Sequence, residues 1–301
     1  MRFVTFMSEN KVKYGVLKDE ETLVPIDELV EVLQDKGLKG IPATLADFIS
    51  VANDNIIYDM KEKLGTPGLM SIPLKNVKLI APIPYPRRNI ICLGKNYVKH
   101  AQEIAGTIKG GGDFPGEPIY FSKFASPAIG PDDYIMAHEN VTSCLDYEVE
   151  LAVVIGKNGM NIKRYEVEEY IFGYTIINDV TARDLQKTHG QWFRGKSLDT
   201  FCPMGPCILH KSEVPFPVKL DISCSINGEL RQSSNTGEMT FDIPYIISQL
   251  SEGIELKAGD IIATGTPEGV GIGFNPPRYL KPGDVVTCTI EKIGTLTNIM
   301  K

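Results

Sequence analysis

The sequence predicts an α+β protein that is mostly β, with a small domain before a larger one. From residue 118 onward, short segments rich in Val, Ile, Tyr and Phe are separated by turn residues, which is the pattern of β-strands. Only residues 181–188 and 243–251 have a convincing helical pattern in this part of the chain. Because the strands do not alternate regularly with helices, we expect a large β-rich fold rather than a βαβ sheet.

Proline residues mark the predicted domain boundary. Pro82, Pro84 and Pro86 occupy alternate positions, where they can continue neither a helix nor a central strand. We therefore expect a small N-terminal α+β domain over residues 1–75 and a larger domain over residues 84–301.

The N-terminal domain should contain short strands and short helices. Residues 2–6 and 14–18 have the composition of strands around a polar turn, and apolar spacing predicts helices over 26–33 and 45–49. We find no chemical motif in this domain, so we expect it to pack against the larger domain or to support a dimer.

The composition argues against several classes of partner. The 301 residues carry a net charge of −7, whereas nucleic acids and anionic membranes attract basic surfaces. No apolar run reaches the ~18–20 residues of a membrane span, and the N-terminal residues do not have the pattern of a signal peptide. The six cysteines form no C-x-x-C pair, which disfavours a zinc knuckle and predicts free thiols in a cytoplasmic protein.

Two acidic residues lie on one face of a predicted strand over residues 145–156. The opposite face is apolar, whereas Glu148 and Glu150 follow Asp146 on this one. At ~3.3 Å of rise per residue, the two glutamates are about 7 Å apart. In a buried site they would raise each other's pKa unless a cation lay between them. The alternative is a solvated outer face, on which neighbouring acids are harmless.

A third acid favours the cation site. Asp179 ends the apolar segment 171–178 and precedes a predicted helix start, with a capping box, at Thr181. A plain cap or turn acid is the alternative at this position. Three carboxylates form an all-oxygen set that suits Mg²⁺ or Mn²⁺, with Ca²⁺ also open, and disfavours zinc.

Five motifs then occur in an order that closely resembles the fumarylacetoacetate hydrolase family. The resemblance covers residues 80–301 and is nearest to the group of acylpyruvases, oxaloacetate decarboxylases and 2-hydroxyhepta-2,4-diene-1,7-dioate isomerases. It implies a mixed β-roll catalytic domain after a small N-terminal domain, a homodimer, and Mg²⁺ or Mn²⁺ held by Glu148, Glu150 and Asp179. The motifs are Cys92-x-Gly94-x-Asn96-Tyr97-x-x-His100-x-x-Glu103, Asp146-Tyr-Glu148-x-Glu150, Asn178-Asp-x-Thr-Ala-Arg-Asp184-x-Gln186, Gly195-Lys196-Ser197 and Gly265-Thr266-Pro267-x-Gly269-Val270.

His100 and Glu103 are three residues apart on a predicted helix and so share one face. A glutamate that accepts a hydrogen bond from one imidazole N–H fixes the tautomer and leaves the other nitrogen basic. On general grounds the pair could be an ordinary surface histidine beside an acid. The resemblance implies instead a catalytic pair on a lid, which activates water or moves a proton, and the glycines at 110–112 fit such a lid.

The resemblance also implies roles for two lysines. Lys196 would stabilise negative charge that develops on a substrate oxygen, and Lys123 would lie near the same site. Phe124 follows Lys123 where many relatives have a proline.

Three further residues would bind substrate by the same resemblance. Gln186 and Thr266 would hold a carboxylate or keto oxygen, and Arg183 would either join them or form a structural salt bridge with Asp184 or Glu150. The glycines Gly269, Gly271 and Gly273 lack the spacing and the following helix of a nucleotide-binding loop, so we interpret them as a turn.

The expected protein is a metal-dependent enzyme that acts on 2-oxo or 2,4-dioxo acids through a stabilised enolate. Oxaloacetate decarboxylation or tautomerisation is the favoured reaction. The alternatives are hydrolysis of an acylpyruvate of the fumarylpyruvate type and isomerisation of 2-hydroxyhepta-2,4-diene-1,7-dioate. A catalytically silent binding or scaffold protein is the alternative from another class.

Overall fold

An eleven-stranded mixed sheet forms the centre of the computed structural model, which describes residues 1–35, 37–38, 40–106, 115–125 and 127–301. Ten strands follow the order β4-β3-β2-β1-β13-β11-β10-β16-β6-β7, and β5 pairs with β1. The pairing of β16 with β6 is parallel and the other pairings in this sheet are antiparallel. The mixed sheet confirms the α+β fold, mostly β, that the sequence predicts.

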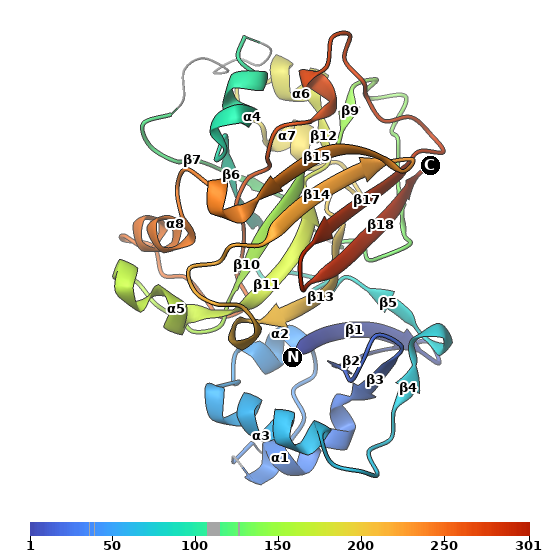
Figure 1. Cartoon of the computed structure of the whole chain (residues 1–301), viewed down its shortest axis with the longest axis vertical. Coiled ribbons are helices and arrows are strands. Elements are labelled where there is room, and N and C mark those ends of the chain that lie inside the picture. Colours follow the sequence, from blue (N-terminus) through green and yellow to red (C-terminus); the bar gives the residue numbers. More distant parts are fainter. Residues whose placement is uncertain (36, 39, 107–114, 126) are drawn as a thin grey trace.

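The N-terminal residues form one end of this sheet and a small helical layer (Figure 1). The helix over 45–49 occurs as predicted, whereas the segment 26–33 divides into a 3-10 turn and α1. Helix α3 was not predicted, because its apolar residues are few and its start depends on the Asn53 side chain, which accepts from Ile56 N–H. The elements are β1 (Arg2–Ser8), β2 (Lys11–Leu17), β3 (Thr22–Pro25), β4 (Ile72–Pro73), α1 (Val30–Asp35), α2 (Leu45–Ile49) and α3 (Asp54–Leu64).

The sheet contains strands from both sides of the proline-containing segment 82–86. β1 pairs with β13 (Met204–His210), with Phe3 opposite Ile208, and β5 (Lys78–Ile80) pairs with the other half of β1. Side chains of α2 share an apolar cluster with residues of the larger part of the chain, such as Phe172. The division into domains of residues 1–75 and 84–301 stays a prediction.

The central strands β10 (Val149–Ile155) and β11 (Ile171–Asn178) are buried along their whole length. Their side chains alternate between two apolar clusters, with Leu151 and Val153 in one and Ala152 and Val154 in the other. This alternation confirms the strand period predicted from the sequence. The remaining strands of this part of the sheet are β6 (Ile90–Gly94), β7 (Ile119–Lys123) and β16 (Ile261–Ala263).

A second, five-stranded sheet packs on one face of β10 and β11, as Figure 1 shows. Its apolar residues join the cluster that contains Leu151 and Val153. Its strands are β8 (Tyr134–Ile135), β14 (Asp221–Ile226), β15 (Glu229–Asn235), β17 (Val285–Ile290) and β18 (Gly294–Met300).

Short helices gather at the end of the molecule opposite the N-terminal residues (Figure 1). Helix α6 begins at Arg183 rather than at Thr181, because residues 181–182 form β12 and pair with β9. The predicted capping box is therefore wrong, and the Thr181 hydroxyl instead donates to the Asp179 carbonyl at 2.8 Å. The elements at this end are β9 (Leu145–Asp146), β12 (Thr181–Ala182), α4 (Val98–Glu103), α6 (Arg183–Thr188) and α7 (Phe193–Lys196), whereas α5 (Val167–Tyr170) and α8 (Ile243–Leu250) lie at the side of the molecule (Figure 1). No helix among the described residues is both long and apolar enough to cross a membrane.

Candidate metal centre

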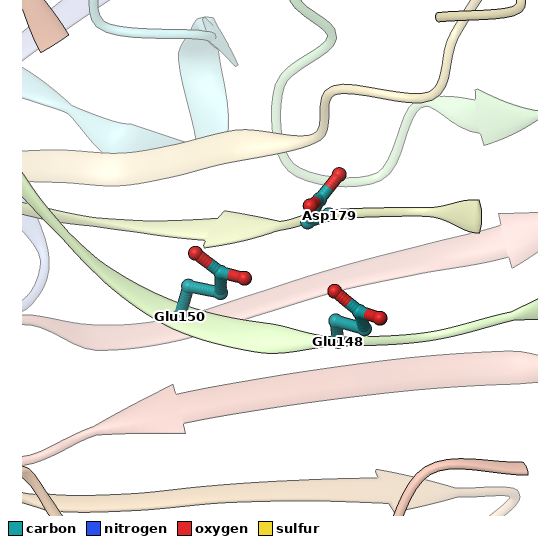
Figure 2. A group of neighbouring side chains, drawn as sticks. All are labelled: Glu148, Glu150 and Asp179. Carbon is teal, nitrogen blue, oxygen red and sulfur yellow. The ribbon is translucent and has the colours of Figure 1, made fainter. Parts of the chain in front are cut away.

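Glu148, Glu150 and Asp179 lie together at one end of the central strands. Because β10 and β11 are antiparallel with Val149 opposite Asn178, the start of β10 meets the end of β11. One carboxylate oxygen from each of the three residues lies within 4.8 Å of the other two. Figure 2 shows the two glutamates on the same segment and Asp179 on the neighbouring one.

All three carboxylates are buried, with exposed fractions of 4%, 1% and 0% for Glu148, Glu150 and Asp179. A solvated outer face is therefore the wrong interpretation of the acidic face of this strand. Buried carboxylates are stable only when cations or hydrogen-bond donors compensate their charge.

Three basic side chains provide part of this compensation. Lys196 Nζ lies 2.6 Å from Glu148 Oε2 and 2.7 Å from Asp179 Oδ2. Arg183 Nη1 lies 2.7 Å from Glu148 Oε1, and Lys123 Nζ contacts Asp179 Oδ1. Burial opposes ionisation of Glu148, but the charges of Lys196 and Arg183 outweigh it and lower the pKa of this carboxyl to about 2.

Glu150 has a different environment. Its Oε2 accepts the Gly265 N–H at 2.8 Å. Burial, with added repulsion from the Asp179 and Glu148 charges, raises the pKa of Glu150 well above its ordinary value. A divalent cation among the three carboxylates would compensate their mutual repulsion and favour the ionised form of Glu150. Hard oxygen donors of this kind suit Mg²⁺ or Mn²⁺. The residues therefore fit a divalent metal site.

Arg183, the first residue of helix α6, contacts two acidic side chains and a glutamine. Its Nε donates to Asp146 Oδ2 at 2.8 Å and its Nη1 donates to Gln186 Oε1 at 3.1 Å. The salt-bridge partners are thus Asp146 and Glu148, not Asp184 or Glu150 as the structural alternative proposed. Arg183 Nη2 is buried and has no hydrogen-bond partner among the described residues. Because an unpaired buried N–H is costly, this atom is suited to an anionic ligand.

His100 and Glu103 share one face of α4, as their spacing predicts. His100 Nδ1 lies 3.4 Å from Glu103 Oε2, and the glutamate also accepts the Gly269 N–H at 2.9 and 3.1 Å. His100 lines the same small cavity as Glu148, Glu150 and Lys196. The glycines at 110–112 that we interpret as part of a lid lie outside the described residues.

Comparisons with known proteins agree with this geometry. The fumarylacetoacetate (FAA) hydrolase C-terminal family matches residues 89–301. The chain belongs to the fumarylacetoacetate hydrolase family. This confirms the resemblance found in the five sequence motifs.

Three members of the family illustrate its range. Oxaloacetate tautomerase YisK from Bacillus subtilis is 46% identical over 304 residues, which cover 99% of both chains. A fumarylacetoacetate hydrolase structure from Exiguobacterium antarcticum is 39% identical with a TM-score of 0.81, and covers 100% of this chain and 99% of its own. Maleylpyruvate hydrolase from Sphingobium sp. SYK-6, solved with manganese(II) and pyruvate, is 30% identical with a TM-score of 0.76, over 100% and 98% of the two chains.

Most of the site residues that the family resemblance implies line the same small cavity. Gln186 and Thr266 line it together with Arg183 and Lys196. The Thr266 hydroxyl also donates to Val149 O at 2.9 Å and accepts from Nε2 of Gln232 at 2.8 Å. This hydroxyl therefore already takes part in two hydrogen bonds within the protein.

Lys123 has a different position from the other predicted residues. It is fully buried and is not among the residues that line the cavity. Its ammonium contacts Asp179 Oδ1 and the carbonyl oxygens of Val180 and Phe201. Lys123 therefore binds the carboxylate of Asp179 from outside the cavity, at the oxygen that Lys196 does not contact.

Sequence reasoning missed Asp146 and Lys95. Asp146 is fully buried and accepts from Arg183 and from the Gly271 and Ile272 amides. Lys95 lines the cavity and has a left-handed φ of 57°. Asp146 was visible as the first acid of the acidic strand face. Lys95 carried a weaker signal, namely its place between Gly94 and Asn96 in the first family motif.

Proposed function

We propose that the protein is a divalent-metal-dependent enzyme that interconverts the keto and enol forms of oxaloacetate. One observation carries the proposal: the carboxylates of Glu148 and Glu150, the Lys196 ammonium and the His100 imidazole line one small cavity. The 46% identity with an oxaloacetate tautomerase supports this substrate.

The arrangement suits a 2-oxo acid. Glu148, Glu150 and Asp179 would hold Mg²⁺ or Mn²⁺, which, when bound, supplies Lewis-acid stabilisation of negative charge on a substrate oxygen. The unpartnered Nη2 of Arg183 would donate to the substrate carboxylate. Gln186, which already accepts from Arg183 Nη1, would orient its amide toward the same group.

The reaction needs one proton to leave C3 and one to reach the oxygen on C2. With the Nδ1–H of His100 directed to Glu103, the Nε2 atom is free to accept the C3 proton. Lys196 would stabilise the negative charge that then develops on the C2 oxygen. Transfer of the proton from His100 to this oxygen would give the enol and restore the neutral imidazole, and the reverse sequence would give the keto form. Loss of CO₂ from C4 would instead give the enolate of pyruvate, whose negative charge lies on the same C2 oxygen, so slow decarboxylation is an expected side reaction.

Acylpyruvate hydrolysis is the second candidate. The maleylpyruvate hydrolase that was solved with manganese and pyruvate supports it. In this reaction His100 would remove a proton from water, the resulting hydroxide would attack the C4 carbonyl, and the C3–C4 bond would break to give a carboxylic acid and the enolate of pyruvate, which the proton held by His100 would convert to pyruvate.

The test is a substrate panel with the purified full chain in Mg²⁺. Enol–keto conversion of oxaloacetate is followed by ultraviolet absorbance, and pyruvate formation from oxaloacetate, acetylpyruvate and fumarylpyruvate by ¹H NMR. We expect rapid tautomerisation of oxaloacetate, which the Glu148→Ala variant should lose. Turnover of an acylpyruvate without tautomerisation would favour the hydrolase. Mn²⁺ binding without turnover of any substrate would favour a silent binding protein.

We also propose that the protein is a homodimer in the cytoplasm. The family resemblance supports the dimer. The six free cysteines, five of which are buried, support a reducing compartment. Light scattering coupled to gel filtration tests the dimer, and a monomeric mass would contradict it.

A further inference from the structure

A glycine-containing loop that follows β16 holds the carboxylate of Glu103. The Gly269 N–H lies 2.9 Å from Glu103 Oε1 and 3.1 Å from Oε2. The distance from the same carboxylate to His100 Nδ1 is longer, at 3.4 Å. The loop therefore provides the tighter contact of the two, although it is 166 residues away from Glu103 in the sequence.

Gly273 leaves the space that the Glu103 side chain occupies. A Cβ atom at this position would lie 2.2 Å from Glu103 Cδ and Oε1 and 2.4 Å from Cγ. These three are the nearest atoms, and all belong to the Glu103 side chain. By contrast, a Cβ atom at Gly271 would lie 2.5 Å from the backbone carbonyl of Arg278. A side chain at position 273 would therefore clash first with the side chain of Glu103.

The loop itself is anchored to the segment that carries the carboxylate cluster. Gly271 N–H and Ile272 N–H donate to the two carboxylate oxygens of Asp146 at 2.6 and 3.0 Å. Gly265 N–H donates to Glu150 at 2.8 Å. Because the loop is fixed at both places, a carboxylate held by the loop has a defined position relative to Glu148 and Glu150.

We infer that residues 269–273 form a cradle that positions Glu103 and, through it, fixes the tautomer and orientation of His100. Gly269 and Gly273 are positioning residues, and neither is assigned contact with the substrate. A carboxylate held by an amide donor keeps its second interaction for the Nδ1–H of His100, so the basic nitrogen is Nε2. The inference deepens the proposed function, because it specifies how the general base is prepared.

The first test is Gly273→Ala, with Gly40→Ala as the matched control, because a Cβ atom at Gly40 meets nothing within 4 Å. The new methyl group should displace the Glu103 carboxylate. We expect kcat for oxaloacetate tautomerisation to fall about 10- to 100-fold, which is less than the about 10²- to 10⁴-fold contribution of a positioned general base because His100 itself is retained, while KM and the affinity for Mn²⁺ change less than about twofold. Gly273→Ala with the kcat of the wild type would overturn the inference.

A second substitution tests whether the effect acts through Glu103. Glu103→Asp shortens the side chain by one methylene and makes room for the methyl group. The double variant should therefore turn over faster than Gly273→Ala alone. If Gly273→Ala fails to fold, the double variant should recover the fold, since Glu103 provides the nearest clash. A double variant that recovers neither fold nor rate would overturn the inference.

The third test needs no substrate, so it separates this inference from the proposed function. The imidazole ¹⁵N shifts of His100, assigned by their loss in His100→Gln, report the tautomer. We expect an Nδ1–H tautomer in the wild type. In Glu103→Gln the Gly269 N–H should hold the amide oxygen and turn the NH₂ group toward His100, which should shift the proton to Nε2. An unchanged tautomer in Glu103→Gln would overturn the cradle even if the enzyme acts on oxaloacetate. Absence of activity with the expected tautomers would refute only the proposed function.

Discussion

The Nε atom of Arg183 lies 2.8 Å from Oδ2 of Asp146, and both side chains are buried. The carboxylate of Asp146 also accepts hydrogen bonds from the backbone N–H groups of Gly271 and Ile272. It therefore joins the cavity-lining Arg183 guanidinium to the loop that holds Glu103. The pair connects two parts of the site that are far apart in the sequence.

Asp146→Asn should destabilise the protein strongly. The change leaves a buried guanidinium with one carboxylate fewer, and breaking such a pair costs roughly 3 kcal/mol or more. The free energy of unfolding from denaturant titration measures this. The control is Glu229→Gln, which weakens an exposed ion pair with Arg278 and should lower the free energy of unfolding far less, because solvent screens exposed charges. Equal losses in the two variants would contradict the prediction.

Metal removal and two glutamate substitutions should have distinguishable effects. EDTA should abolish turnover, and Mg²⁺ or Mn²⁺ should restore it; full activity of the chelated protein would refute a metal role. Glu148→Gln and Glu150→Gln should both lose Mn²⁺ binding in a titration.

The same two variants should differ in metal-free stability. Glu148→Gln should lower the melting temperature, because Lys196 and Arg183 lose a buried counter-charge. Glu150→Gln should maintain or raise it, because it removes a carboxylate that Asp179 and Glu148 repel. A lower melting temperature for Glu150→Gln than for Glu148→Gln would contradict this electrostatic account.

Lys123→Met should weaken metal binding rather than substrate binding. The ammonium holds Asp179 from behind and does not line the cavity. Its loss should lower the affinity for Mn²⁺ by about 10- to 100-fold, which is typical for groups that orient metal ligands. At saturating Mn²⁺ the KM for oxaloacetate should change little. A large rise in KM under these conditions would instead support the substrate-binding role that the sequence suggested.

Stability should fall between about pH 6.5 and pH 4 partly because of His210. Burial, with smaller effects from the N-terminal amine and Lys211, lowers the pKa of His210 to about 4. The unfolded chain binds this proton near pH 6.5, whereas the folded protein does not bind it until about pH 4. The stability present above pH 6.5 is therefore lost as the pH falls through this window, by roughly 3 kcal/mol at most.

The measurement is the free energy of unfolding at several pH values for the wild type and His210→Gln. The variant should have a shallower pH dependence between pH 4 and 6.5. His189→Gln, at an exposed position, should behave as the wild type does. A pH dependence of His210→Gln equal to that of the wild type would exclude this contribution.

Local patterns in the sequence predicted the fold class and the acidic residues well. The alternation along residues 145–156 identified the strand face that carries Glu148 and Glu150, because alternation is a property of the extended backbone itself. The predicted helix start at Thr181 was wrong, since pairing with Asp146 extends the backbone there. Local propensity cannot anticipate a partner strand that lies 35 residues earlier in the sequence.

The sequence by itself determined the family, the β-rich fold and the identity of the three acids, since these depend on residue type, spacing and strand period. Only the tertiary structure decided that the acids are buried, that Lys123 supports Asp179 from behind, and that the loop at Gly269 and Gly273 holds Glu103. The physical reason is that these contacts join segments brought together by strand pairing and packing. Their distances and burial depend on the whole arrangement, which no local pattern of residues encodes.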